Sequence, residues 1–169
     1  MEKKKAQKRD LNGKNTKYEH LVAHCMEEDV GLPEGYVIIH TKEWNNDEIV
    51  NLYKAGGWWR ETYDPSGISE LIRGSFDFVV VQELSSKRAV AMGRLISDGV
   101  SDGYIQDLVV FPEHRGKGIG AAMTRELVRT GLNRGLGWIG LIAQEGTSDF
   151  YLKLGFKRFK GEPMLFDME

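Results

Sequence analysis

The stretch that decides the fold reads DLVVFPEHRGKGIG and covers residues 107–120. It begins with a short apolar run, breaks at Pro112 and continues into a glycine-rich turn. After the turn, Ile119, Met123 and Leu127 recur at the spacing of the buried face of a helix. The stretch therefore predicts a strand, a glycine-rich loop and a helix that begins at the loop.

A glycine-rich loop that opens a helix is typical of a phosphate-binding site, because unpaired backbone N–H groups gather at the positive end of the helix dipole. Two nucleotide motifs fit the sequence poorly. A Walker A loop needs Ser or Thr after Gly-Lys, and here Gly118 follows Lys117. The dinucleotide pattern is met literally by Gly116, Gly118 and Ala121. However, the first glycine of that motif lies at the end of a strand, whereas here residues 111–115 separate Gly116 from the strand. The motif also needs repeated parallel crossovers, and the pattern of this chain predicts only one.

The same stretch resembles motif A of the GCN5-related N-acetyltransferase (GNAT) superfamily. The signature of that motif is Arg or Gln, two residues, Gly, one residue, and Gly or Ala, and Arg115, Gly118 and Gly120 satisfy it. A second stretch, FYLKLGF at residues 150–156, resembles motif B of the same superfamily. The resemblance spans about residues 36–166. Because the two motifs occur at the spacing expected for the superfamily, both support the same N-acetyltransferase interpretation.

The flanking pattern predicts an α+β (mixed α/β) fold. Alternating and β-rich runs predict strands at 36–40, 76–84, 88–97, 104–110 and 138–144, with final strands within 156–167. Helices are predicted at 46–55, 65–73, 119–134 and 147–154. Short turns between the middle strands imply antiparallel pairing, and the long helix implies one parallel crossover. The resemblance implies a GNAT-like central sheet, mostly antiparallel and splayed, with helices on its faces.

Charge and composition divide the 169-residue chain into three parts. Residues 1–17 carry seven bases and two acids, a net +5, and predict a basic mobile tail. Residues 18–34 read as an N-terminal extension with helical spacing, and residues 35–169 form the predicted N-acetyltransferase domain. The overall charge of −2 leaves −7 outside the tail, which argues against nucleic acid as the main partner.

Several classes of protein and site are disfavoured. No apolar run approaches the roughly 20 residues of a membrane span. Cys25 is the only cysteine, which excludes an internal disulfide and disfavours a cysteine-based zinc site, so we expect no metal. We expect a cytoplasmic protein, either a monomer or a homodimer.

The resemblance implies acetyl-CoA as co-substrate. In the family the peptide-like pantetheine arm pairs with the strand before the loop, which here places Leu108, Val109 and Val110 beside it. The loop amides then face the pyrophosphate, whereas Lys117 is as readily a solvated side chain. The full set of expected cofactor-binding residues adds Arg115, Gly116, Lys117, Gly118, Ile119, Gly120, Ala121 and Gln144.

The resemblance also implies a catalytic role for Tyr151, as the general acid that protonates the departing thiolate. The alternative is a buried tyrosine with a packing role. By the same resemblance, the backbone N–H of Val110 is the expected oxyanion donor. Several relatives carry a glutamate base where this chain has Gln106, and strand alternation predicts that Asp107 faces the opposite side. The base therefore stays open between a water chain, Glu61 and bulk solvent.

In the family the acceptor pocket is formed by the first two helices and their loop, a region rich in aromatic residues here. The sequence predicts an amine-binding pocket in which aromatic rings surround a small primary amine. Core packing is an equal alternative for the paired tryptophans. A protein terminus or lysine as acceptor, and a non-enzymatic acyl-CoA sensor, are the other functions considered. The candidate acceptor-binding residues are Trp44, Trp58, Trp59, Glu61 and Tyr63.

Overall fold

The structure, a computed structural model, describes residues 31–166. Five strands form one sheet in the order β1-β2-β3-β4-β5. Neighbouring strands from β1 to β4 are antiparallel, whereas β4 and β5 are parallel. This confirms the predicted α+β class with its single parallel crossover. The strands are β1 (Tyr36–His40), β2 (Asp77–Glu83), β3 (Ala89–Ile96), β4 (Asp102–Val110) and β5 (Trp138–Gly140).

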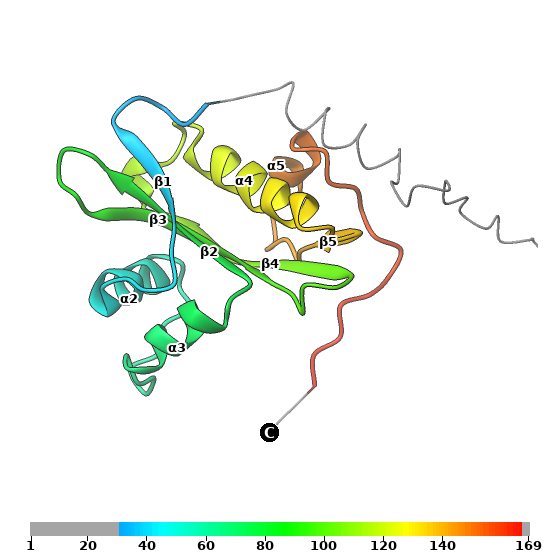
Figure 1. Ribbon diagram of the computed structural model, residues 1–169, viewed down its shortest axis with the longest axis horizontal. Helices are drawn as coiled ribbons and strands as arrows, with labels where there is room; N and C mark the ends of the chain where they lie inside the picture. Colours follow the sequence, from blue (N-terminus) through cyan, green and yellow to red (C-terminus); the bar gives the residue numbers. More distant parts are fainter. Residues whose placement is uncertain (1–30, 167–169) are drawn as a thin grey trace, which may run out of the picture.

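Helices cover both faces of the sheet (Figure 1). One face carries the two helices between β1 and β2, and the other carries the long helix between β4 and β5. Their bounds agree with the predicted ones to within two residues at each end. The helices are α2 (Asn46–Ala55), α3 (Gly67–Gly74), the short 3₁₀ helix η1 (Pro112–His114), α4 (Ile119–Asn133) and α5 (Ser148–Lys153).

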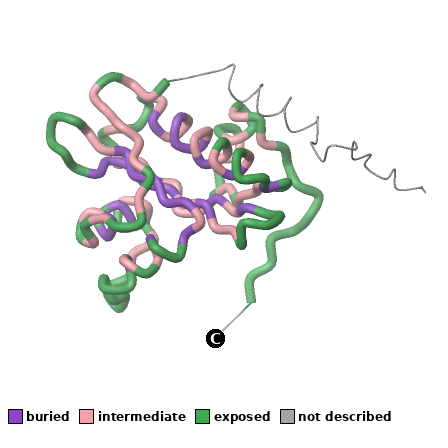
Figure 2. The backbone as a smooth tube through the Cα atoms, viewed as in Figure 1, coloured by how far each residue is buried: buried purple, intermediate pink, exposed green. Residues whose placement is uncertain are grey.

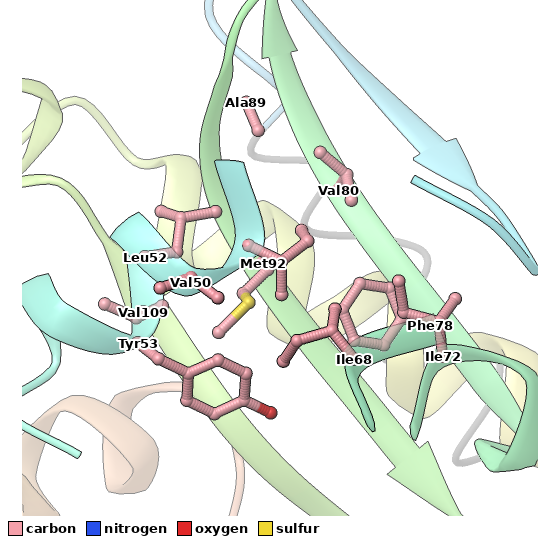
Figure 3. Packing of buried hydrophobic residues seen from close by; sticks show 11 residues of the cluster. Val50, Leu52, Tyr53, Ile68, Ile72, Phe78, Val80, Ala89, Met92 and Val109 are labelled. Atoms are coloured by element: carbon pink, nitrogen blue, oxygen red, sulfur yellow. The ribbon is translucent and has the colours of Figure 1, made fainter. Parts of the chain in front are cut away.

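Two apolar clusters, one on each face, sandwich the sheet. Strand alternation divides them: Phe78 and Val80 face α2 and α3, whereas Val79 and Val81 face α4. Figure 2 shows the buried backbone concentrated in the central strands and on the inner side of α4. Figure 3 shows the cluster under α2 and α3, with Tyr53 at its edge. The sheet is thus fixed on both sides, and β4 can serve as a rigid support for a site.

A β-bulge in β4 interrupts this alternation. Met92 pairs with Val109 and Arg94 pairs with Gln106, so Gly93 alone faces both residue 107 and residue 108. The backbone of Asp107 has φ 56°, a left-handed conformation that Asp tolerates better than most residues. The bulge turns residues 106 and 107 to the same face of the sheet. The prediction that Asp107 lies opposite to Gln106 is therefore wrong, because the extra residue resets the two-residue period.

Gly93 is required opposite the bulge, because a Cβ there would lie 2.6 Å from Leu108 Cδ2 and 3.3 Å from Leu127 Cδ1. We expect Gly93→Ala to lower the free energy of unfolding by about 1–3 kcal/mol, the usual cost of overpacking. Urea denaturation measures the change. Gly74→Ala is the matched control, since no atom lies within 4 Å of a Cβ at that position. Equal effects of the two substitutions would contradict this description of the bulge.

The predicted final strands within 156–167 are absent from the described part, residues 156–166. Phe156 still packs against the core, but Phe159 is 74% exposed and Leu165 is 95% exposed. The preceding strand is also shorter than predicted, since β5 ends at Gly140 and not at residue 144. β5 therefore offers only three residues with which a further strand could pair. In addition, Pro163 has no backbone N–H to donate to a neighbouring strand. These two features explain why the segment runs along the outside (Figure 1).

The predictions for the basic tail at 1–17 and for most of the extension at 18–34 lie outside the described residues. The first described strand begins at Tyr36, one residue after the predicted domain start.

Candidate acyl-donor and acceptor sites

The loop between β4 and α4 is built to bind an anion. Gly116 and Gly118 have φ of 76° and 86°, a conformation that side chains with a Cβ rarely adopt. Gly118 is the N-cap of α4, and no side chain caps this helix. The first N–H groups of α4 therefore lack helical partners and sit at the positive end of the helix dipole. Ile119 is 1% exposed, so it contributes only backbone here.

Basic side chains and β1 hold the loop in place. Lys117 Nζ donates to Tyr36 Oη over 3.1 Å, and the Tyr36 hydroxyl hydrogen-bonds to His114 Nδ1 over 2.9 Å. Arg115 Nε donates to the Val110 carbonyl at the end of β4 over 2.9 Å. The two cationic side chains thus sit at the loop, but both already have protein partners. Their structural role in fixing the loop was not foreseen from the sequence.

Beyond its first residues, β4 has an open edge. It pairs with β5 only from Asp102 to Tyr104, although it continues to Val110. Phe111 N donates to Val90 O on the β3 side. Because successive amides of a strand point to opposite edges, the N–H of Val110 points toward the open side. The structure therefore leaves backbone groups around Leu108, Val109 and Val110 free of a β5 partner among the described residues.

Tyr151 lies on α5, close to the glycine loop. Its ring contacts Phe150 and Phe156 with centroid distances of 4.9 and 5.8 Å. A Phe150 ring carbon is 3.6 Å from the position that a Cβ on Gly120 would take, so α5 packs against the start of α4. Burial raises the pKa of Tyr151, which keeps the hydroxyl protonated. Within residues 31–166 this hydroxyl has no hydrogen-bond partner, so it can donate to a ligand.

The remaining predicted cofactor residues are peripheral in the structure. The Gln144 carbonyl accepts hydrogen bonds from Thr147 N and Oγ1 at 3.0 and 2.8 Å, which shapes the turn before α5. The side chain of Gln144 is exposed, and Ala121 is half-buried on α4.

The predicted acceptor residues gather on the α2 and α3 side, with one exception. Trp59 lies 6.4 Å from Tyr53 and 5.7 Å from Tyr63 between ring centroids, and Trp58 lies 6.3 Å from Tyr53. These tryptophans are only partly buried against the core, as is Trp44, whose Nε1 donates to Glu48 over 2.7 Å. Glu61 is exposed, and within residues 31–166 no hydrogen bond or ion pair joins it to the rings.

A polar network next to these rings was missed from the sequence. The Tyr53 hydroxyl donates to Asp107 Oδ2 over 2.7 Å, and Arg94 Nε donates to the same oxygen over 2.5 Å. Arg94 also donates to Gln106 Oε1 over 2.9 Å. Burial, and then the charge of Asp107, hold the pKa of Tyr53 well above its usual value, so Tyr53 remains a donor.

Comparison with known proteins identifies this arrangement. The family model described as "Acetyltransferase (GNAT) domain" matches residues 74–158, which contain the glycine loop, the open edge of β4 and α5. The chain belongs to the GNAT acetyltransferase family. This confirms the resemblance drawn from residues 107–120 and 150–156.

The proteins to which this GNAT chain is similar in sequence carry different functional names. "GCN5-related N-acetyltransferase 2, chloroplastic" of Arabidopsis thaliana is 38% identical over 76 residues, which are 45% of this chain and 30% of that protein. "Histone acetyltransferase TAP1" of Glycine max is 39% identical over 71 residues, 42% of this chain and 31% of that protein. The chain thus spans about a third of the length of these relatives.

A solved structure agrees with the GNAT fold over most of the chain. The crystal structure of glucosamine-6-phosphate N-acetyltransferase from Arabidopsis thaliana has a TM-score of 0.65 at 17% identity, and it covers 80% of this chain and 100% of that one. The likeness shows the fold alone.

Two classes of feature are absent from residues 31–166. No helix there is both long and apolar enough to cross a membrane. Nor does that range hold a group of three or more His, Cys, Asp or Glu side chains arranged to bind a metal ion.

Proposed function

We propose that the chain is an N-acetyltransferase that moves the acetyl group of acetyl-CoA to a primary amine, most simply that of a small molecule. The observation that carries the proposal is the uncapped glycine loop at the start of α4, directly beside the open edge of β4. An extended ligand with an anionic end and a peptide-like arm matches both features at once. Acetyl-CoA has this form, and family membership supports it as co-substrate.

In this proposal the pyrophosphate accepts hydrogen bonds from the backbone amides of residues 116–120. Because Gly116, Gly118 and Gly120 have no side chains, nothing at these positions blocks the approach of the pyrophosphate to the backbone. The pantetheine arm then pairs with β4 along residues 108–110. The thioester lies beside the strand, where an amide on the open edge, such as that of Val110, stabilises the oxyanion.

The chemistry is a direct transfer. The amine lone pair attacks the thioester carbonyl carbon, the C–N bond forms, and the C–S bond then breaks with its electron pair on sulfur. Tyr151 donates its proton to the thiolate and regains one from solvent, while the amine nitrogen loses one proton to solvent. The free hydroxyl of Tyr151 and its raised pKa support this role, because the acid must be protonated before collapse.

The acceptor enters from the α2 and α3 side, where Trp58 and Trp59 lie beside Tyr53, which contacts β4 through Asp107. Aromatic rings favour a small amine with an apolar or aryl body. The histone acetyltransferase named among the relatives favours a lysine side chain as the second candidate. We further propose that the domain at 35–169 is cytoplasmic. Its oligomeric state, either a monomer or a homodimer, stays a prediction.

Thiol release from acetyl-CoA tests the proposal. The wild-type chain is incubated with phenethylamine, glucosamine 6-phosphate or a lysine-containing histone-tail peptide. We expect amine-dependent release of free CoA, fastest with a small amine. Release that is greatest with the peptide would favour the second candidate. Tight acetyl-CoA binding without release for any amine would favour the sensor.

The pH profile follows from the missing glutamate at Gln106. No carboxylate at that position takes a proton from the ammonium, so we expect kcat/KM to rise about tenfold per pH unit toward the acceptor's own pKa. Because burial raises the pKa of Tyr151 above its usual range, no falling limb is expected below about pH 10. Gln106→Glu should move the rise to lower pH. A plateau already reached at pH 7 would reveal a tuned base.

A further inference from the structure

Three ionisable side chains that the proposed chemistry does not use meet on the α4 face of the sheet. His40 is the last residue of β1, two residues after Ile38, which packs toward α4. Asp77 is the first residue of β2, two residues before Val79, which also packs toward α4. Because residues two apart on a strand share a face, both ionisable side chains point to α4. There His40 contacts Glu126, about two helical turns after the start of α4.

The imidazole of His40 lies between the two carboxylates, with one ring nitrogen facing each. Nδ1 is 3.0 Å from both oxygens of Asp77, and Nε2 is 2.9 Å from Oε1 of Glu126. An ionised carboxylate only accepts, so each ring nitrogen must supply the hydrogen for its own contact. A neutral imidazole has one N–H group, whereas the imidazolium has two. Both contacts are therefore formed together only when His40 is protonated.

The charges around His40 favour a positive imidazole. The side chains of Asp77 and Glu126 are 9% and 16% exposed, whereas that of His40 is 42% exposed and so reaches solvent protons. Burial raises the pKa of Glu126, but the hydrogen bonds and charges of Arg129 and His40 outweigh it, so this pKa lies below its usual value. Lys42 donates to backbone carbonyls after α3 and to neither carboxylate. The groups that face His40 are thus two acids and one base, Arg129.

We propose that His40, Asp77 and Glu126 form a pH-sensitive clasp, which fastens α4 to β1 and β2 when the imidazole is protonated. Loss of the proton leaves one ring nitrogen with a lone pair that faces a carboxylate oxygen, so that contact becomes repulsive. The clasp joins the strand that leads into α2 to the helix that begins at the glycine loop. One proton therefore ties together the two layers on which the acceptor and donor sides are built. The clasp does not depend on the proposed acetyl transfer.

His40→Gln tests the clasp, because glutamine can form one of the two contacts but does not titrate. We expect the thermal midpoint of the wild type to exceed that of the variant by about 2–4 °C at pH 5.5, the scale of one partly exposed ion pair in a domain of this size. The difference should vanish by pH 9, where a neutral imidazole keeps only one contact. All other titrating groups are common to both proteins, so the difference between the midpoints isolates position 40.

His114→Gln is the matched control, since His114 is half-buried and contacts the Tyr36 hydroxyl, which can either donate or accept. Its midpoint should differ from that of the wild type by the same amount at both pH values. Glu126→Gln is the second arm, because an amide can donate to a neutral imidazole. With Glu126→Gln in both chains, the effect of His40→Gln should lose at least half of its pH dependence.

Differential scanning calorimetry at pH 5.5 and pH 9 gives all of these midpoints. An effect of His40→Gln that is equal at the two pH values, or larger at pH 9, would overturn the proposal, because the imidazole would then be held in its neutral form. An unchanged pH dependence in the Glu126→Gln background would also overturn it, since Glu126 would then not be one of the two groups that the proton joins.

Discussion

Gly118→Val is expected to weaken acetyl-CoA binding by at least about 100-fold. The residue has φ 86°, which strains any β-branched side chain, and it begins α4. Valine there pushes the loop out of shape and places methyl groups where the pyrophosphate approaches. Each hydrogen bond to a charged group contributes about 1.5–3 kcal/mol, so losing two accounts for a 100-fold change in Kd. Titration calorimetry of the variant with acetyl-CoA gives the value.

Gly135→Val is the control for backbone strain. Gly135 has φ 87°, no atom lies within 4 Å of a Cβ there, and it follows the other end of α4. Both variants should lose comparable stability, but only Gly118→Val should lose acetyl-CoA binding. If Gly135→Val weakened binding as strongly, the effect would come from general destabilisation and the loop would have no special role.

Tyr151→Phe is expected to lower kcat by about tenfold or more, with little change in acetyl-CoA affinity. A positioned general acid contributes about 10²–10⁴ in rate, and the low end applies because water can also protonate a thiolate. The phenyl ring keeps its contacts with Phe150 and Phe156, so the free energy of unfolding should change by no more than about 1 kcal/mol. Steady-state kinetics with a thiol-detecting reagent separates kcat from KM.

Tyr104→Phe removes a hydroxyl from a half-buried tyrosine of β4 that has no part in the proposed chemistry, and it should retain wild-type kcat. Wild-type kcat in Tyr151→Phe as well would show that Tyr151 only packs between its aromatic neighbours, and protonation by water would then be the simpler mechanism.

Most of the fold could be predicted from the sequence because local signals agree with the tertiary contacts. The glycines at 116 and 118 and the apolar spacing from Ile119 fix the loop and α4, and both appear as expected. The terminal strands were predicted wrongly because a β-rich composition says nothing about an available edge. β5 ends at Gly140, so residues 156–166 find no ladder to join.

The parts of the candidate site that are formed by backbone groups could be predicted from the sequence. The parts that depend on the exact strand register could not. The loop amides and the edge of β4 follow from glycine positions and strand order. The network around Asp107 depends on one extra residue in β4, which alternation alone cannot reveal. The signal was Gly93, an isolated glycine in the neighbouring strand, since such a glycine often marks a bulge or a close backbone approach.

Hydrogen exchange with and without acetyl-CoA tests the central claim most directly, because that claim concerns particular backbone amides. The wild-type chain is labelled in deuterated buffer and exchange is followed peptide by peptide. We expect acetyl-CoA to slow exchange most at residues 116–120 and at the open edge of β4 near Val110, since amides bonded to a ligand are protected. Unchanged exchange in the loop, with protection elsewhere or none, would contradict the account.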